Sequence, residues 1–181
     1  LQDEVERRGQ KQLSLRLRRA AFQPGKTLER FDFGFNPGLD RQRVLDLATC
    51  SFIERGEPVL IVGPSGVGKS HLAQAFGHEA CRRGYDVVYI NAARLLTHLA
   101  GGRADGTYER RLQGYARPDL LIIDDFGLKP LRAPASEDFY DLINERYERA
   151  ATILTSNRAL EEWPALFSDP LLASAGLDRL F

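Results

Sequence analysis

Hydrophobic positions along the chain alternate between short apolar runs and longer amphipathic stretches. The short runs are rich in β-branched residues and cover 58–62, 86–90, 120–123 and 152–155. The longer stretches repeat their apolar residues every three or four positions and cover 1–21, 39–55, 71–83, 92–100, 108–117 and 136–150. Short runs of this kind predict buried strands, and the longer stretches predict amphipathic helices. Because strands and helices alternate, the pattern predicts an α/β fold with a parallel sheet flanked by helices.

Glycine, proline and serine indicate where these elements begin and end. Pro24-Gly25 breaks the first helix, and Gly84 suits the C-terminus of the helix over 71–83. The glycines at 101, 102 and 106 predict a flexible break between two helices. Ser136 is a residue type favoured at N-caps and predicts the start of the helix over 136–150.

The composition is typical of one ordinary soluble domain. Of 181 residues, 28% are charged and 43% are hydrophobic, and the formal net charge is zero. No apolar run approaches the roughly 18–20 residues of a membrane span, and no secretory signal opens the chain. Cys50 and Cys81 are too few for a disulfide framework, so we expect buried thiols in the cytoplasm. The chain lacks Met and stops at Phe181 within a predicted helix, so we expect a piece of a longer protein.

The charges are unevenly distributed along the chain. Residues 1–30 contain eight Lys or Arg and four Asp or Glu, and residues 94–117 contain five and two. Residues 119–148 contain eight acidic and three basic residues. A basic surface facing nucleic acid would give this pattern, and so would ordinary solvated helices. The N-terminal helix leaves the same choice, since its basic face could contact DNA or a partner while its apolar stripe packs on the domain.

The strongest chemical signal is a glycine-rich loop at residues 63–70. Its sequence, Gly-Pro-Ser-Gly-Val-Gly-Lys-Ser, follows a predicted strand and opens a predicted helix, which is the context of a P-loop. Glycines let several backbone N–H groups approach one phosphate, and the start of the helix adds positive potential. Lys69 would reach the β- and γ-phosphates of ATP, and the Ser70 hydroxyl would bind Mg²⁺. We assign nucleotide binding to Gly63, Pro64, Ser65, Gly66, Val67, Gly68, Lys69, Ser70 and, next along the helix, His71.

Further polar residues follow the predicted strands. Asp124 and Asp125 end the strand over 120–123, where Asp124 would hold Mg²⁺ and Asp125 would orient the attacking water. Asn157 follows the strand over 152–155 and would contact the γ-phosphate or the water, although a turn-forming Asn fits the same position. Spacing alone leaves Arg179 either an arginine finger, which is a catalytic arginine, or a surface residue.

From about Leu28 to the end of the chain, the sequence resembles the IstB family. These are AAA+ P-loop ATPases that assist the transposition of insertion sequences and are related to DnaC-type helicase loaders. The resemblance rests on the loop at 63–72, Leu-Leu-Ile-Ile-Asp-Asp-Phe-Gly at 120–127, Ile-Leu-Thr-Ser-Asn-Arg at 153–158, Glu-Glu-Trp at 161–163, Asp-Pro-Leu-Leu-Ala at 169–173 and Leu-Asp-Arg-Leu at 177–180.

The resemblance implies a role for each candidate catalytic residue. Residues 63–70 are implied to be Walker A, and Asp124 and Asp125 to be Walker B. Asn157 is implied to be sensor 1, and Arg179 an arginine finger offered to the nucleotide of a neighbouring subunit. Lys69, Asp125, Asn157 and Arg179 would then carry ATP hydrolysis in a homo-oligomer. Many AAA+ proteins have Asp-Glu in Walker B, so the shorter Asp125 puts its contact with the water in doubt.

The resemblance also implies partners and a division of the chain. We expect a basic helical arm at 1–23, a linker at 24–38 that packs near the nucleotide, and an AAA+ core at 39–181 whose C-terminal lid is truncated. Residues 92–117 occupy the place of an extra helix that lines a nucleic-acid path in related initiators. The candidates for sequence-independent contacts with duplex DNA are Arg94, Arg103, Arg110 and Arg111.

The implied function is that of an ATP-dependent transposition helper in the cytoplasm. Its ATP-bound oligomer would assemble on target DNA and recruit the transposase of the same insertion sequence, and hydrolysis would reset the assembly. Three alternatives stay open: a DnaC-like helicase loader, a nucleotide-gated scaffold without hydrolysis, and a small-molecule P-loop kinase. The kinase would need a lid and an acceptor pocket, which the sequence does not indicate.

Overall fold

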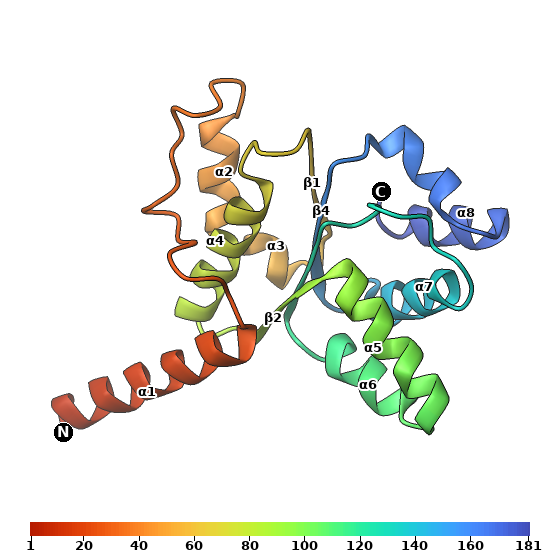
Figure 1. Cartoon of the computed structure of the whole chain (residues 1–181). Helices are drawn as coiled ribbons and strands as arrows, with labels where there is room; N and C mark the ends of the chain where they lie inside the picture. The colour runs from red at the N-terminus through yellow and green to blue at the C-terminus, as the bar shows by residue number, and fades with distance from the viewer.

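The computed structural model describes residues 1–181 and contains one parallel sheet between two layers of helices (Figure 1). Its strands are β1 (Val59–Val62), β2 (Val87–Asn91), β3 (Leu120–Asp124) and β4 (Ala151–Ser156). They are arranged in the order β1-β4-β3-β2, and every neighbouring pair is parallel. The predicted α/β fold with a parallel sheet is therefore confirmed, and the carboxyl ends of β1, β4 and β3 lie side by side.

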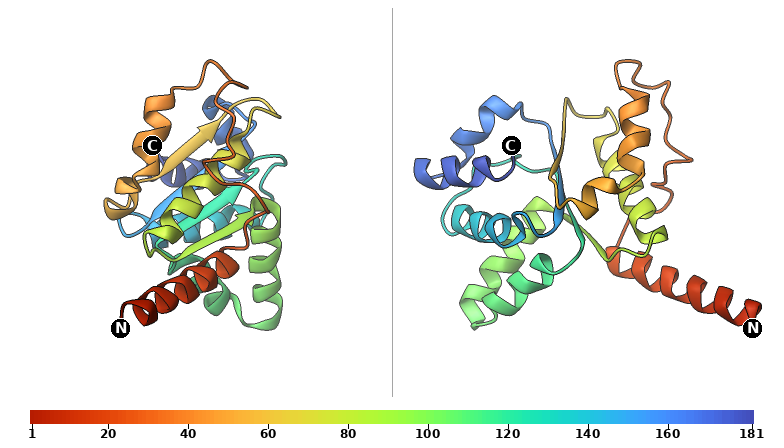
Figure 2. Two further views of the ribbon diagram at one scale, coloured as in Figure 1. Left: turned by 90° about the vertical axis from the view of Figure 1, so that its left-hand side faces the viewer. Right: turned by 180° about the vertical axis from the view of Figure 1, so that it is seen from behind.

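Eight α-helices and one 3₁₀-helix accompany the sheet. They are α1 (Gln2–Ala20), α2 (Arg41–Ala48), α3 (Ser51–Glu54), α4 (Lys69–Arg82), α5 (Ala92–Asp105), α6 (Tyr108–Ala116), α7 (Ala135–Arg146), the 3₁₀-helix η1 (Leu160–Leu166) and α8 (Pro170–Asp178). Helices α2, α3 and α4 cover one face of the sheet, and α5 to α8 cover the other (Figure 2).

Each face of the sheet has its own hydrophobic core. In β3, Leu120 and Ile122 pack towards α4, whereas Leu121 and Ile123 pack towards α5 and α7. Successive side chains of a strand point to opposite faces, so a strand between two helical layers must be apolar throughout. All residues of β3 are buried, and the two cores fix the carboxyl end of this strand in the centre of the sheet.

Several of the predicted helix boundaries are wrong. The helix predicted over 39–55 is divided at Cys50, which has a left-handed φ of 63° and separates α2 from α3. The break predicted at Gly101-Gly102 is absent, because α5 continues to Asp105 and ends before Gly106. At Gly102, a Cβ atom would lie 2.8 Å from the backbone of Tyr108, so this glycine allows α6 to pack closely on α5.

Ser136 is not the N-cap that its residue type predicted. It lies inside α7, is buried, and donates a hydrogen bond of 2.8 Å to the carbonyl of Leu131. The helix also ends at Arg146, earlier than predicted. The hydroxyl therefore fixes the loop before α7 and leaves the helix terminus uncapped by a side chain.

Helix α1 projects from the body of the molecule, and only its C-terminal end is anchored (Figures 1 and 2). Phe22 stacks on His78 with 4.6 Å between ring centroids, and a Cβ atom at Gly77 would lie 2.4 Å from the Phe22 ring. The glycine in α4 therefore makes room for this anchor. None of the helices is both long and apolar enough to cross a membrane. Both cysteines are free and buried, as predicted.

Candidate active site

The glycine-rich loop connects β1 to α4 at the carboxyl edge of the sheet. Gly63 N–H donates to the carbonyl of Ser156 at 3.2 Å, which joins the loop to the end of β4. Gly66 and Gly68 have φ values of +79° and +95°, a region that favours glycine. The first backbone N–H groups of α4 have no partners within the helix and are available to an anion.

Lys69 is held at the mouth of this loop. Its side chain is 9% exposed, and Nζ donates to the Pro64 carbonyl at 2.5 Å. Burial lowers the pKa of Lys69, while the carboxylates of Asp125 and Asp124 act in the opposite direction. An ammonium group has three donors, and only one is used within the chain. The remaining donors are available to phosphate oxygens.

Asp124 forms the centre of a network of hydroxyl groups. Ser70 Oγ and Tyr89 OH both donate to Asp124 Oδ2, at 2.7 and 2.6 Å, and Thr155 Oγ1 donates to Oδ1. The carboxylate is 4% exposed and forms no salt bridge. A hydroxyl and a carboxylate in contact are hard oxygen ligands of the type that Mg²⁺ prefers.

Asp125 adopts an unusual backbone conformation. Its φ of +58° is left-handed, and its N–H donates to Thr155 Oγ1 at 2.9 Å. Asn91 Nδ2 donates to Asp125 Oδ2 at 3.4 Å. Burial, and then the adjacent charge of Asp124, raise the pKa of Asp125. The turn places the two carboxylates on the same groove, in which a water molecule can reach Asp125.

Asn157 lies next to the glycine-rich loop. It directly follows β4, its side chain is exposed, and it forms no hydrogen bond within the chain. Because the carbonyl of the preceding Ser156 accepts from Gly63, the backbone at Asn157 adjoins the start of the loop. The structure therefore brings together the loop, both aspartates and Asn157, the residues that the sequence placed in one site.

Arg179 lies at the opposite edge of the sheet from these residues. It lines a cavity of about 220 Å³ with Pro58 and Ala150, which directly precede β1 and β4. Its guanidinium lies 5.5 Å from the Tyr140 ring centroid and 5.4 Å from that of Tyr147. Strands of this length span roughly 13–20 Å, so Arg179 is remote from the loop of its own chain.

The four candidate DNA-contacting arginines fall into two pairs. Arg103 contacts the buried carboxylate of Asp138 at 2.6 Å, and Arg111 contacts Asp105 at 2.9 Å. Arg94 and Arg110 are exposed and form no salt bridge. The ion pairs of Arg103 and Arg111 stabilise α5 and α6, so the uncommitted charge of this region belongs to Arg94 and Arg110.

The linker before α2 packs against the start of α4. His71 Nε2 donates to the Thr27 carbonyl at 2.8 Å, and the Phe31 ring meets His71 edge-on at 5.3 Å between centroids. Phe31 also lies close to Gly68, since a Cβ atom there would be 3.3 Å from its ring. Phe35, by contrast, is 68% exposed. Two of the clustered linker aromatics, Phe31 and Phe33, therefore pack on the core edge beside the loop.

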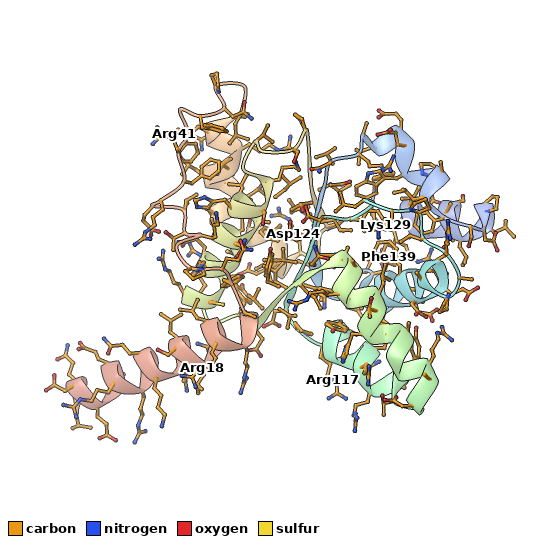
Figure 3. All side chains as sticks on the ribbon, in the orientation of Figure 1. Arg18, Arg41, Arg117, Asp124, Lys129 and Phe139 are labelled. Carbon is orange, nitrogen blue, oxygen red and sulfur yellow. The ribbon has the colours of Figure 1, made fainter.

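Sequence reasoning missed two hydroxyl groups of the site, those of Tyr89 and Thr155. Their signal was a polar residue near the end of an otherwise apolar strand. It could be interpreted only with the strand order, since β2 and β4 are the two neighbours of β3. Both hydroxyl groups contact Asp124, which ends the central strand β3 and is labelled in Figure 3.

Comparison with known proteins supports this arrangement. The sequence model of the IstB-like ATP-binding protein family matches residues 1–181. An ATP-binding protein in an insertion sequence of Mycobacterium tuberculosis is 44% identical over 99% of this chain and 72% of its own length. The insertion sequence IS21 ATP-binding protein of Pseudomonas aeruginosa is 42% identical over 99% of this chain and 68% of its own.

A solved structure shares the fold. The AMPPCP-bound DnaA from Aquifex aeolicus has a TM-score of 0.71 and 29% sequence identity. The match covers 86% of this chain and 48% of the DnaA chain. The AAA+ P-loop fold predicted from the sequence is thus confirmed.

Proposed function

The chain belongs to the family of IstB-like ATP-binding proteins, and we propose that it is an ATP-dependent helper of transposition. In this proposal its ATP-bound oligomer assembles on duplex DNA in the cytoplasm and recruits the transposase of the same insertion sequence. Hydrolysis of ATP then resets the assembly. The names of its relatives, which are ATP-binding proteins of insertion sequences, support this assignment over that of a helicase loader.

The contact between Ser70 and Asp124 carries the hydrolytic part of the proposal. A serine of the loop and a buried aspartate of β3, 54 positions apart, meet at 2.7 Å. No basic residue forms a salt bridge with this carboxylate, and its hydrogen-bond partners are hydroxyl groups that can turn away. Burying an uncompensated charge is costly, so an exchangeable arrangement of this kind is typical of a ligand site.

Each residue of the site has a defined task with ATP bound. The loop N–H groups and Lys69 bind the phosphates, and Ser70 and Asp124 would hold Mg²⁺. When bound, Mg²⁺ would neutralise negative charge on the β- and γ-phosphates. Asp125 orients the water that attacks the γ-phosphorus, and Asn157 contacts the water or the γ-phosphate. The phosphorus–oxygen bond to ADP breaks as the bond to water forms.

The distance of Arg179 from its own loop supports a role between subunits. An arginine that stabilises the transferred phosphoryl group must approach it directly. Arg179 lies half-buried at the amino edge of the sheet, where its guanidinium donates to the Ala175 carbonyl at 2.7 Å. It would leave this contact to reach the nucleotide of a neighbouring copy. A head-to-tail interface of this kind repeats into a ring or a helix.

The rate of ATP hydrolysis against protein concentration tests the proposal. We expect the rate per chain to rise cooperatively with concentration and to rise further with duplex DNA and the transposase. Ser70→Ala is the control, since it retains the fold but loses a Mg²⁺ ligand. A rate per chain that changes with neither protein concentration nor DNA would contradict a site shared between subunits. Stimulation by single strands and a replicative helicase instead would identify a helicase loader.

A further inference from the structure

Two cavities lie along the unpaired edge of β2, and together they are called the groove here. This strand pairs only with β3, so its other edge is open. Helix α1 and the residues after it form one wall, and α6 forms part of the other (Figure 1). The groove consists of a cavity of about 270 Å³ at the amino end of β2 and one of about 560 Å³ at its carboxyl end.

Positive charge gathers at the amino end of this groove. Arg16 and Arg19 enter it from α1, and Arg117 enters it from the end of α6. None of the three forms a salt bridge, whereas six other arginines of the chain do. Asp86 is the single carboxylate that lines this cavity. Figure 3 shows the side chain of Arg117 extending from α6.

The wall on the α6 side contains a helical glycine that the fold itself does not require. Gly114 lies inside α6, is exposed, and has no heavy atom within 4 Å of the place of a Cβ atom. Glycine in a helix costs about 0.5–1 kcal/mol relative to alanine. At Gly77 and Gly102 the close approach of another segment explains the glycine, but nothing in the chain approaches Gly114. A ligand backbone in the groove would make that approach.

We propose that this groove binds the sugar–phosphate backbone of DNA, with Arg19 and Arg117 on phosphates from opposite walls. The inference rests on the proposed function and moves the main contact from residues 94–111 to the facing walls of α1 and α6. Only Arg94 of the earlier candidates lines the groove, at its carboxyl end. That end also contains Asp124 and Asp125, so bound DNA would lie beside the ATP site.

The test compares two double variants that remove equal charge. The first, Arg19→Gln with Arg117→Gln, removes two positive charges from the groove. The second, Arg43→Gln with Arg132→Gln, is the control. All four arginines are exposed and form no salt bridge, so the two pairs are matched. Binding of the complete chain to a fluorescein-labelled duplex is measured by anisotropy over a range of salt concentrations with a non-hydrolysable ATP analogue. Each lost phosphate contact lowers the slope of log K against log salt by about 0.9.

For the groove variant we expect a slope smaller by about 2 and affinity weaker by about tenfold, with the control unchanged. An unchanged slope in the groove variant would overturn the proposal and would leave the groove to an acidic protein partner. Equal losses in both variants would also overturn it, because the effect would then come from net charge alone. If the wild-type chain itself bound no DNA, both the proposed function and the groove proposal would be overturned, whereas an unchanged slope would overturn the groove proposal alone.

Discussion

The two edges of the sheet can be compared through one buried charged side chain at each, neither of which forms a salt bridge. At the carboxyl edge this is Asp124, and at the amino edge it is Arg146, with exposures of 4% and 1%. All three guanidinium nitrogens of Arg146 donate hydrogen bonds, and most of their acceptors are backbone carbonyls. It donates to the carbonyls of Tyr115, Ala116, Pro118 and Ala151 and to the hydroxyl of Thr152.

The difference between the two edges lies in how easily the partners can move. Carbonyl groups fixed in the backbone cannot leave Arg146, so this charge fastens β4 to the segment before β3. Hydroxyl groups can rotate away from Asp124, and its carboxylate opens on a groove. We therefore infer that the charge with fixed partners serves the fold and that the charge with exchangeable partners serves chemistry.

Loss of Arg146 should have the largest effect on stability. Arg146→Met removes a donor from four carbonyls and from the Thr152 hydroxyl, and we expect the free energy of unfolding to fall by roughly 3–5 kcal/mol. Burial lowers the pKa of Arg146 to about 10, so the group is charged at neutral pH. Urea denaturation measures the loss. Arg149→Met, at an exposed position on the same segment, should cost under about 0.5 kcal/mol. Equal losses of stability in the two variants would show that Arg146 contributes no more to the fold than an exposed arginine does.

Loss of the Asp124 charge should affect hydrolysis and spare the fold. Asn keeps an acceptor for the hydroxyl groups and removes a buried charge, so Asp124→Asn should change unfolding by less than about 1 kcal/mol. The ATPase rate should fall on the order of 10²–10³-fold, with weaker Mg²⁺ dependence of nucleotide binding. A variant as unstable as Arg146→Met would show that Asp124 is a structural charge.

The smallest effects compare two threonines of β4. Thr155 contacts Asp124 and the Asp125 backbone, whereas Thr152 contacts Arg146. Thr155→Val should lower the ATPase rate about tenfold by releasing the Asp124 carboxylate and the Asp125 backbone, and Thr155→Ser should restore it. Thr152→Val should cost about 1 kcal/mol of stability and leave the rate per folded chain unchanged. Similar ATPase rates for the two valine variants would show that Thr155 does not contribute to the site.

Much of the fold could be predicted because each strand and helix has a local pattern. The four strands, the glycine-rich loop and both aspartates were recognisable from apolar periodicity and residue type. The division at Cys50 and the continuous α5 could not be predicted, because long-range packing decides them: at Gly102 the approach of α6 overrides the usual preference of glycine for a break.

The site could be predicted in its parts but not in its connections. Asp124 is identifiable from the end of an apolar strand, but Tyr89 and Thr155 join it only through the order of strands in the sheet. Arg146 resembled any helical arginine in the sequence, and only its burial among carbonyls reveals its role. The functions of Asn157 and Arg179 depend on a bound nucleotide and a second chain, so they stay predictions.

The most direct test of the shared site mixes two inactive variants. If Asp125 orients the attacking water and Arg179 completes a neighbouring site, Asp125→Asn and Arg179→Ala should each be nearly inactive alone. In a mixed oligomer, the Arg179→Ala chain has an intact loop that Arg179 of a neighbouring Asp125→Asn chain can complete. We expect an equal mixture to recover about a quarter of the wild-type ATPase rate, because random head-to-tail assembly completes one interface in four. A mixture no more active than its components would contradict the account.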